Sequence, residues 1–277
     1  MTYSSPHIKN IFKTFKPKDP LVRKYVDYYY LEVKPNNVVN EFKCFPHYNN
    51  TISLYRTHYR SVDGATTYDP KREPLQIFTP VRDKILHVKQ IGKIHRIVIV
   101  FHPLGIQNFI TKMDFTKKIF GINFLNKKEL NILFSTVNID ELTTLLNDCL
   151  NRRYKSFEQP ILEKTIQEIF EDSNHFSVTA LSDDLGVSRQ YLNRLFKQMM
   201  GISVKTFHKI VVFRKTIHHK LLDNPKANFT ELAHQYNFSD QSHFNKTYRK
   251  FTQNTPHSFY EEGTLLGSED TFWHLSS

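Results

Sequence analysis

A repeated unit occupies the second half of this 277-residue chain, and each copy consists of a short helix, a tight turn and a second helix. The first copy spans residues 176–201 and the second spans residues 228–251. In both copies, apolar residues recur at helical spacing on either side of a residue that tolerates a left-handed backbone, Gly186 or Asn237. Two copies of this pattern predict an all-α region in which each second helix buries one face and exposes the other.

The first copy carries signals for the start of both of its helices. Ser177 can cap the first helix, and Phe176 can pack on Leu181 as a hydrophobic staple. Ser188 can cap the second helix, in which leucine, phenylalanine and methionine side chains form the inward stripe. The opposite face holds side chains suited to the base edges and phosphates of DNA. These side chains are Arg189, Gln190, Asn193, Arg194 and Lys197.

The second copy repeats the plan with different residues. Asn228 and Glu231 have the spacing of a capping box, and we expect Ser239 to cap the second helix. Aromatic side chains of that helix point inward at helical spacing. Its outward side chains are Gln241, Ser242, His243, Asn245, Lys246 and Arg249. We predict that these side chains contact DNA, together with the two caps Ser188 and Ser239 and the outward residues of the first copy.

A long segment with helical spacing of its apolar residues, 204–222, joins the two copies. A single helix of this length spans roughly 28 Å, and successive major grooves on one face of DNA lie about 34 Å apart. One copy of the chain could therefore place its two second helices in adjacent grooves. Residues 185–222 hold eight basic and no acidic side chains. Among these we expect Lys205, Lys209 and Lys215 to contact phosphates.

The first half of the chain has the pattern of a β-rich domain. Short runs of β-branched and aromatic residues are separated by Pro, Asn, Asp and Gly, as in a sandwich or a barrel. The predicted strands are residues 28–33, 51–55, 75–79, 84–91 and 95–101.

The clearest helix of the first half is predicted over residues 138–153, and it carries a leucine stripe. Leu142, Leu145, Leu146 and Leu150 share one face of this helix. Such a stripe buries equally well against the chain's own core or against a second copy of the chain. Core packing and a dimer seam are therefore both open, and the seam is the hypothesis that predicts a homodimer.

The charge of the chain favours a polyanionic partner. Lys and Arg number 38 against 27 Asp and Glu, which gives +11, and the whole excess lies in residues 1–159. For the charge of that half we rank solubility first and an acidic effector second. No run of about 18 apolar residues occurs, so we expect a soluble cytoplasmic protein.

The cysteines and histidines lack the spacing of a metal or catalytic site. Cys44 and Cys149 lie far apart in the sequence and follow no paired metal spacing. The histidines of the predicted barrel form neither a His-x-His pair nor a helical His-x-x-x-His pair with a nearby Glu. We therefore expect no enzymatic activity, no metal and no cofactor. A β-barrel metalloenzyme with a helical appendage is the alternative.

Residues 161–260 resemble the paired helix-turn-helix domain of AraC/XylS-type transcription regulators. The resemblance is carried by LGVSRQYLNRLFK, by GIS before the long helix, and most distinctively by FSDQSHFNKTYRKFTQNTPHSF. Ser182, His218, Asn237 and Gln253 depart from the residues usual in that family. The first half more loosely resembles the cupin-like sensory domains of some such regulators, in LVRKYVDYYYLEV and RIVIVFHPLG.

Together with this resemblance, the residues predict an α+β protein of two domains and a tail. Residues 1–155 are expected to form a β-rich, cupin-like domain that senses an effector or pairs subunits. Residues 160–262 are expected to form the DNA-binding domain, and residues 263–277 a C-terminal tail. The implied function is a transcription regulator whose partners are double-stranded DNA, a second copy of the chain, a small-molecule effector and RNA polymerase.

Overall fold

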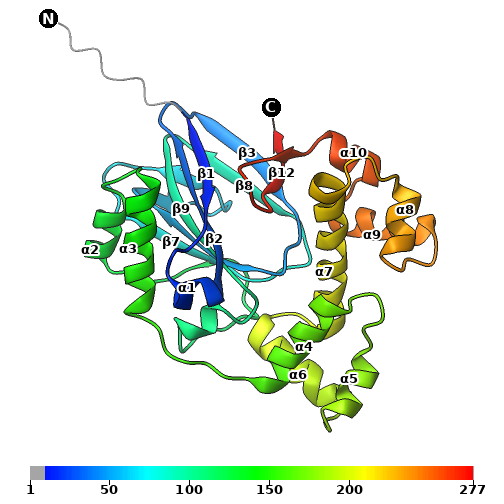
Figure 1. Ribbon diagram of the computed structural model, residues 1–277. Coiled ribbons are helices and arrows are strands. Elements are labelled where there is room, and N and C mark those ends of the chain that lie inside the picture. The colour runs from blue at the N-terminus through cyan, green and yellow to red at the C-terminus, as the bar shows by residue number, and fades with distance from the viewer. Residues whose placement is uncertain (1–9, 277) are drawn as a thin grey trace, which may run out of the picture.

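The structure is a computed structural model that describes residues 10–276 and places a β-rich half beside a helical half (Figure 1). The predicted order, a β-rich domain followed by a helical domain with two helix-turn-helix units, is confirmed. The sheets lie on one side of helix α7 (Val204–His218), and the two helix-turn-helix units lie at its two ends (Figure 1).

One six-stranded sheet forms the inner layer of the β-rich half, and every strand in it runs antiparallel to its neighbours. Its central strand β9 is buried at seven of its eight positions, because the sheet is covered on both faces. In spatial order its strands are β1 (Ile11–Phe15), β2 (Val26–Lys34), β9 (Ile94–Phe101), β4 (Asn50–Tyr55), β7 (Leu75–Thr79) and β10 (Phe120–Gly121).

A second six-stranded sheet covers one face of the first. Strands β6 and β8 pair in parallel, and the other neighbours are antiparallel. In spatial order its strands are β11 (Thr264–Leu265), β12 (Phe272–Ser276), β3 (Val39–Cys44), β8 (Leu86–Ile91), β6 (Thr66–Tyr68) and β5 (His58–Arg60).

The predicted strands are confirmed as β2, β4, β7, β8 and β9, with bounds that differ by two residues or fewer. Each carries the β-branched and aromatic residues that favour a pleated, buried surface. Strands β1 and β3 were not predicted, because the sequences IFKTF and VNEFKC mix charged and apolar residues. Their neighbours in the two sheets determine their conformation.

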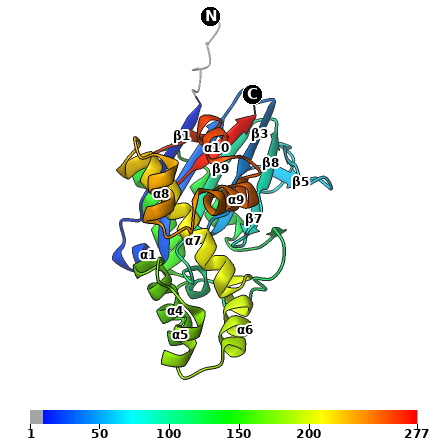
Figure 2. The ribbon, with the colours of Figure 1, turned by 90° about the vertical axis from the view of Figure 1, so that its right-hand side faces the viewer.

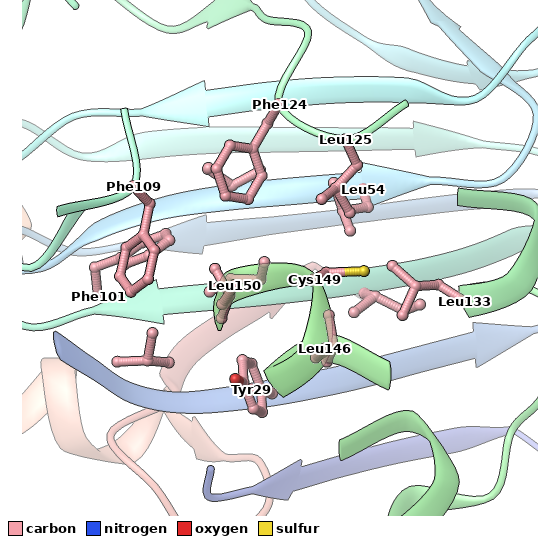
Figure 3. Packing of buried hydrophobic residues seen from close by; sticks show 14 of the residues in the cluster. Tyr29, Leu54, Phe101, Phe109, Phe124, Leu125, Leu133, Leu146, Cys149 and Leu150 are labelled. Atoms are coloured by element: carbon pink, nitrogen blue, oxygen red, sulfur yellow. The ribbon is translucent and has the colours of Figure 1, made fainter. Parts of the chain in front are cut away.

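Helix α3 (Ile139–Asn151) packs against the other face of the first sheet (Figure 3). Leu142, Leu146 and Leu150 are fully buried there, and the hydroxyl of Tyr29 donates to Asn147 Oδ1 at 3.0 Å. Leu145 is half-buried and packs against the same cluster. The leucine stripe is therefore core within one chain, and the dimer-seam hypothesis is wrong for it. The remaining helical segments of this half are α1 (Pro20–Tyr25), the 3₁₀ turn η1 (Ile106–Asn108) and α2 (Lys127–Leu133).

The helical half is built around α7, against which both units bury their apolar faces. The first unit comprises α5 (Val178–Asp184) and α6 (Arg189–Met200), preceded by α4 (Pro160–Glu171). The second unit comprises α8 (Phe229–Gln235) and α9 (Gln241–Thr252), followed by α10 (Pro256–Glu261).

The connector, predicted as one α-helix over residues 204–222, is shorter in the structure. Helix α7 ends at His218, and η2 (His219–Asp223) is a single π-helical turn. The N–H of Asn224 donates to the carbonyl of His219 at 2.8 Å and closes that turn. Pro225 follows and has no N–H with which to continue the helix.

We expect Leu146→Ala to lower the free energy of unfolding by about 2 to 5 kcal/mol, because the substitution leaves a cavity under α3. Urea denaturation followed by circular dichroism measures this change. Ile132→Ala, at a position that is 51% exposed, is the matched control and should have a small effect. Unchanged stability of Leu146→Ala, accompanied by a loss of dimers, would restore the seam hypothesis.

Candidate nucleic-acid interface

Helix α6 buries one face and presents the other to solvent, as predicted. Its N-cap Ser188 accepts a hydrogen bond from the N–H of Tyr191 at 3.1 Å. Leu192, Phe196 and Met200 have no exposed surface and fix the rotation of the helix. The opposite face exposes Arg189, Gln190, Arg194 and Lys197, with Asn193 half-buried beside them.

The turns of both units adopt the left-handed backbone that was predicted for them. Gly186 has a φ of 64°, and Asn237, at the equivalent position of the second unit, has a φ of 54°. The Asn237 side chain also donates to the carbonyl of Asn174 at 2.9 Å, and Asn174 Nδ2 donates to the carbonyl of Gln235 at 2.9 Å. These reciprocal bonds tie the second unit to the loop before the first, and a glycine at position 237 could not make the first of them.

Helix α9 is capped by Asp240 and not by Ser239, which corrects the predicted N-cap by one residue. Asp240 has an extended backbone, and its carboxylate accepts from the N–H of His243 at 2.7 Å. Ser239 instead donates its hydroxyl to Asp240 Oδ2 at 3.3 Å. A carboxylate is favoured at this position because the helix dipole is positive there. Gln241 is consequently the first residue of the helix.

A groove of about 760 Å³ lies between the two units and is floored by α7. We call it the inter-unit groove; the predicted residues that line it are Arg189, Gln190, Asn193, Lys205, Lys209 and His243. Figure 2 shows the first unit near one end of α7 and the second unit near the other. The other predicted side chains lie on α6 and α9 outside the lining, and they are Arg194, Lys197, Gln241, Ser242, Asn245, Lys246 and Arg249.

The groove also has lining residues that sequence reasoning missed. Thr179, His208 and Thr247 line it alongside the predicted set. Thr247 lies one helical turn after His243, so helical spacing could have found it. His208 could not be found in this way, because its place depends on a contact of Nε2 with the carbonyl of Ser173 at 2.7 Å.

Positive charge is concentrated along the α7 floor of the groove. Lys205 and Lys209 are exposed there. The pKa of Lys209 is lowered by partial burial and then by the nearby ammonium groups of Lys250 and Lys205. A phosphate placed among these groups would relieve their mutual repulsion.

Lys215 does not belong to this surface, although it was predicted to contact phosphate. It is half-buried, and its ammonium donates to the carbonyl of Phe170 at 2.7 Å and to the hydroxyl of Ser173 at 2.9 Å. Burial lowers the pKa of Lys215. The side chain therefore holds the C-terminal end of α4 on α7.

No metal centre is evident in residues 10–276, where no three His, Cys, Asp or Glu side chains come together in a way that could hold an ion. Nor is any helix among those residues long and apolar enough to cross a membrane.

Comparisons with known proteins identify the helical half. The model of a helix-turn-helix domain family matches residues 181–262. The Msm operon regulatory protein of Streptococcus mutans serotype c is 29% identical over 85 residues, which are 31% of this chain and 30% of that protein. The match therefore spans less than a third of the length of this relative.

Two solved structures are similar to this chain, one over most of its length and the other over less than half. ToxT from Vibrio cholerae matches with 11% identity and a TM-score of 0.48, over 83% of this chain and 96% of that one. The C-terminal domain of AraT, a response regulator from Geobacillus stearothermophilus, matches with 24% identity and a TM-score of 0.36, over 42% of this chain and 94% of that one. With the family match and the capped, paired units described above, residues 181–262 form a helix-turn-helix domain of the AraC type.

Proposed function

We propose that this chain is a sequence-specific DNA-binding transcription regulator that inserts α6 and α9 into successive major grooves of one operator. The observation that carries the proposal is the inter-unit groove, where both units and α7 present basic and amide side chains to a single concave surface. The helix-turn-helix family match supports it, as does the regulatory name of the Streptococcus mutans relative.

The geometry of the two units favours one DNA face. Helix α7 has 15 residues, and the reciprocal bonds of Asn174 add a second link between the units. At 1.5 Å per residue α7 spans about 22 Å, and successive major grooves on one face of DNA lie about 34 Å apart. The two units lie at the two ends of α7 (Figure 1), so we propose that α6 and α9 reach adjacent grooves. Lys205 and Lys209 would then contact phosphates between the two grooves.

Helix α6 would read base edges with Arg189, Gln190, Asn193 and Arg194. Asn193 Nδ2 donates to the carbonyl of Arg189 at 3.0 Å, so this amide must rotate away from its own helix to bind a base. The guanidinium of Arg194 lies over the ring of the exposed Tyr191, 5.5 Å from the ring centre. Helix α9 would read a second site with Gln241, Ser242, Asn245 and Lys246.

The β-rich half would modulate this activity through a small-molecule effector or through a homodimer. Because the α3 leucine stripe is core, a dimer must use another surface of this half. Contact with RNA polymerase would follow from the proposed role in transcription.

We expect Asn193→Ala and Arg194→Ala each to cost about 1 to 3 kcal/mol of binding free energy on the preferred operator, because a base contact is lost. The preference at one or two base pairs should relax at the same time. Operator selection from a random DNA pool, followed by titration, measures both effects. Equal losses on operator and on random DNA would contradict the assignment of these residues to base reading.

Two lysines of α7 should separate phosphate contact from structural support. Lys209→Met should lower the slope of log K against log salt concentration by about 1, because one phosphate contact is lost. Lys215→Met should leave that slope unchanged and lower the free energy of unfolding by about 1 to 3 kcal/mol, because its bonds to α4 are lost. Titrations at several salt concentrations and urea denaturation test the pair. The reverse pattern would place Lys215 on the DNA.

Inserting five base pairs between the two half-sites should reduce binding toward the non-specific level. Half a turn of DNA moves the second major groove to the opposite side of the duplex, out of reach of a unit fixed to α7. A ten-base-pair insertion restores the face but moves the second groove about 34 Å further along the duplex, so it should reduce binding as well. If affinity is undiminished by the five-pair insertion, only one unit binds DNA and the bipartite proposal fails.

A further inference from the structure

Residues 264–276, which were predicted to belong to a C-terminal tail, pack against the β-rich half. We call residues 264–276 the clasp; they contain β11 and β12 and come directly after α10 of the second unit. Strand β12 pairs with β3, with Trp273 opposite Cys44 and Leu275 opposite Phe42. Figure 1 shows this segment between α10 and the edge of the sheet.

A single carboxylate in the clasp joins the connector helix to the β-rich half. The guanidinium of Arg214, on α7, donates through Nε to Asp270 Oδ2 at 2.8 Å and through Nη2 to Oδ1. His47 Nε2 lies 2.9 Å from the same carboxylate. His47 Nδ1 accepts from the N–H of Asn49 at 3.1 Å, and burial holds the pKa of His47 well below its usual value. The neutral ring therefore carries its proton on Nε2 and donates it to Asp270.

Two further contacts hold the clasp against β1 and the residue that follows it. Lys16 Nζ lies 2.7 Å from Glu269 Oε2, and the N–H of Ser268 donates to Thr14 Oγ1 at 2.9 Å. These contacts are partly exposed, whereas the side chain of Arg214 is only 3% exposed. The pair of Arg214 and Asp270 is thus the costliest of these contacts to break, because separation leaves a buried charge without a partner.

The clasp also places an aromatic ring between the two sheets. Trp273, the one tryptophan in the sequence, is 8% exposed and stacks on Phe42 at 4.6 Å. The guanidinium of Arg96 lies 5.9 Å from the ring centre. A void of about 90 Å³ beside the ring is also lined by Arg214 and Asp270. A change in side-chain packing between the two sheets would therefore act directly on residues of the clasp and of the connector helix.

The clasp contacts the side of α7 that faces away from the inter-unit groove. Arg214 lies nine residues after Lys205, which at about 100° per residue places it about 180° around the helix. Lys205 lines the groove, and Arg214 lines the void between the sheets. The clasp therefore does not cover the proposed DNA surface. Its contacts with α7 instead affect where the two units lie.

We propose that the clasp couples the β-rich half to DNA binding, by holding α7 and the second unit in the arrangement that binds two grooves. This inference rests on the proposed function. If a seated clasp favours the DNA-binding arrangement, operator binding must in return stabilise the clasp by the same factor, because binding linkage is reciprocal.

The first test measures operator affinity in full-length variants. Asp270→Asn should lower affinity for the two-site operator by about tenfold, while binding to a DNA with the α6 half-site alone stays unchanged. Glu73→Gln is the matched control, because it removes an exposed ion pair with Lys127 of α2 that involves neither α7 nor the clasp. Equal losses on both DNAs would mean that Asp270→Asn damages the domain as a whole and would overturn the inference.

The second test uses the unmodified chain and cannot fail through misfolding. Hydrogen exchange of the β12 amides should slow by about tenfold when the selected operator is added, while amides of β7 in the other sheet keep their rates. Unchanged exchange in β12 overturns the clasp inference even where operator binding is intact. A chain that selects no preferred DNA sequence contradicts the proposed function itself, which is a separate result.

Discussion

The burial of the connector helix α7 is the constraint on which the rest of the structure depends. Nine of its 15 residues are buried, among them Phe207, Phe213 and Arg214. One part of its surface receives the first unit, another receives the second, and a third faces the β-rich half through Asp270. A helix shared in this way cannot rotate without disturbing all three, so the spacing of α6 and α9 is fixed by core packing.

This shared packing explains why one departure from the family pattern is compatible with the fold. The usual glycine of the second turn is replaced by Asn237, which adopts the same left-handed backbone. Its amide then bonds to Asn174 across the gap between the units. The substitution therefore replaces backbone freedom with a direct link, and both residues of that link line the inter-unit groove.

Local signals in the sequence were sufficient for the elements that local chemistry determines. The capping residues Ser177, Ser188 and Asn228 and the apolar spacing of α6 and α9 predicted both units, and dense β-branched runs predicted the main strands. The placement of Arg189, Gln190 and Asn193 together on the outer face of α6 followed from the same periodicity. The prediction of Ser239 as the cap of α9 was wrong by one residue, because Asp240 directly after it is an equally good cap.

Features that depend on distant partners could not be predicted from the sequence. Leu146 fits a core or a seam equally well until the sheet beneath it is known. Lys215 is an ordinary basic residue in the sequence, and its role depends on the carbonyl of Phe170. The C-terminal segment was expected to be a tail. Its strand β12 could not be predicted, because it is defined by its pairing with β3, more than 200 residues earlier in the chain.

Hydroxyl-radical footprinting of the full chain on a selected operator tests the central claim most directly. Two helices held by one rigid connector should protect two patches on one face of the duplex, centred about one helical turn apart. A single protected patch would contradict the claim, because it would mean that one unit contacts DNA while the other only supports the fold.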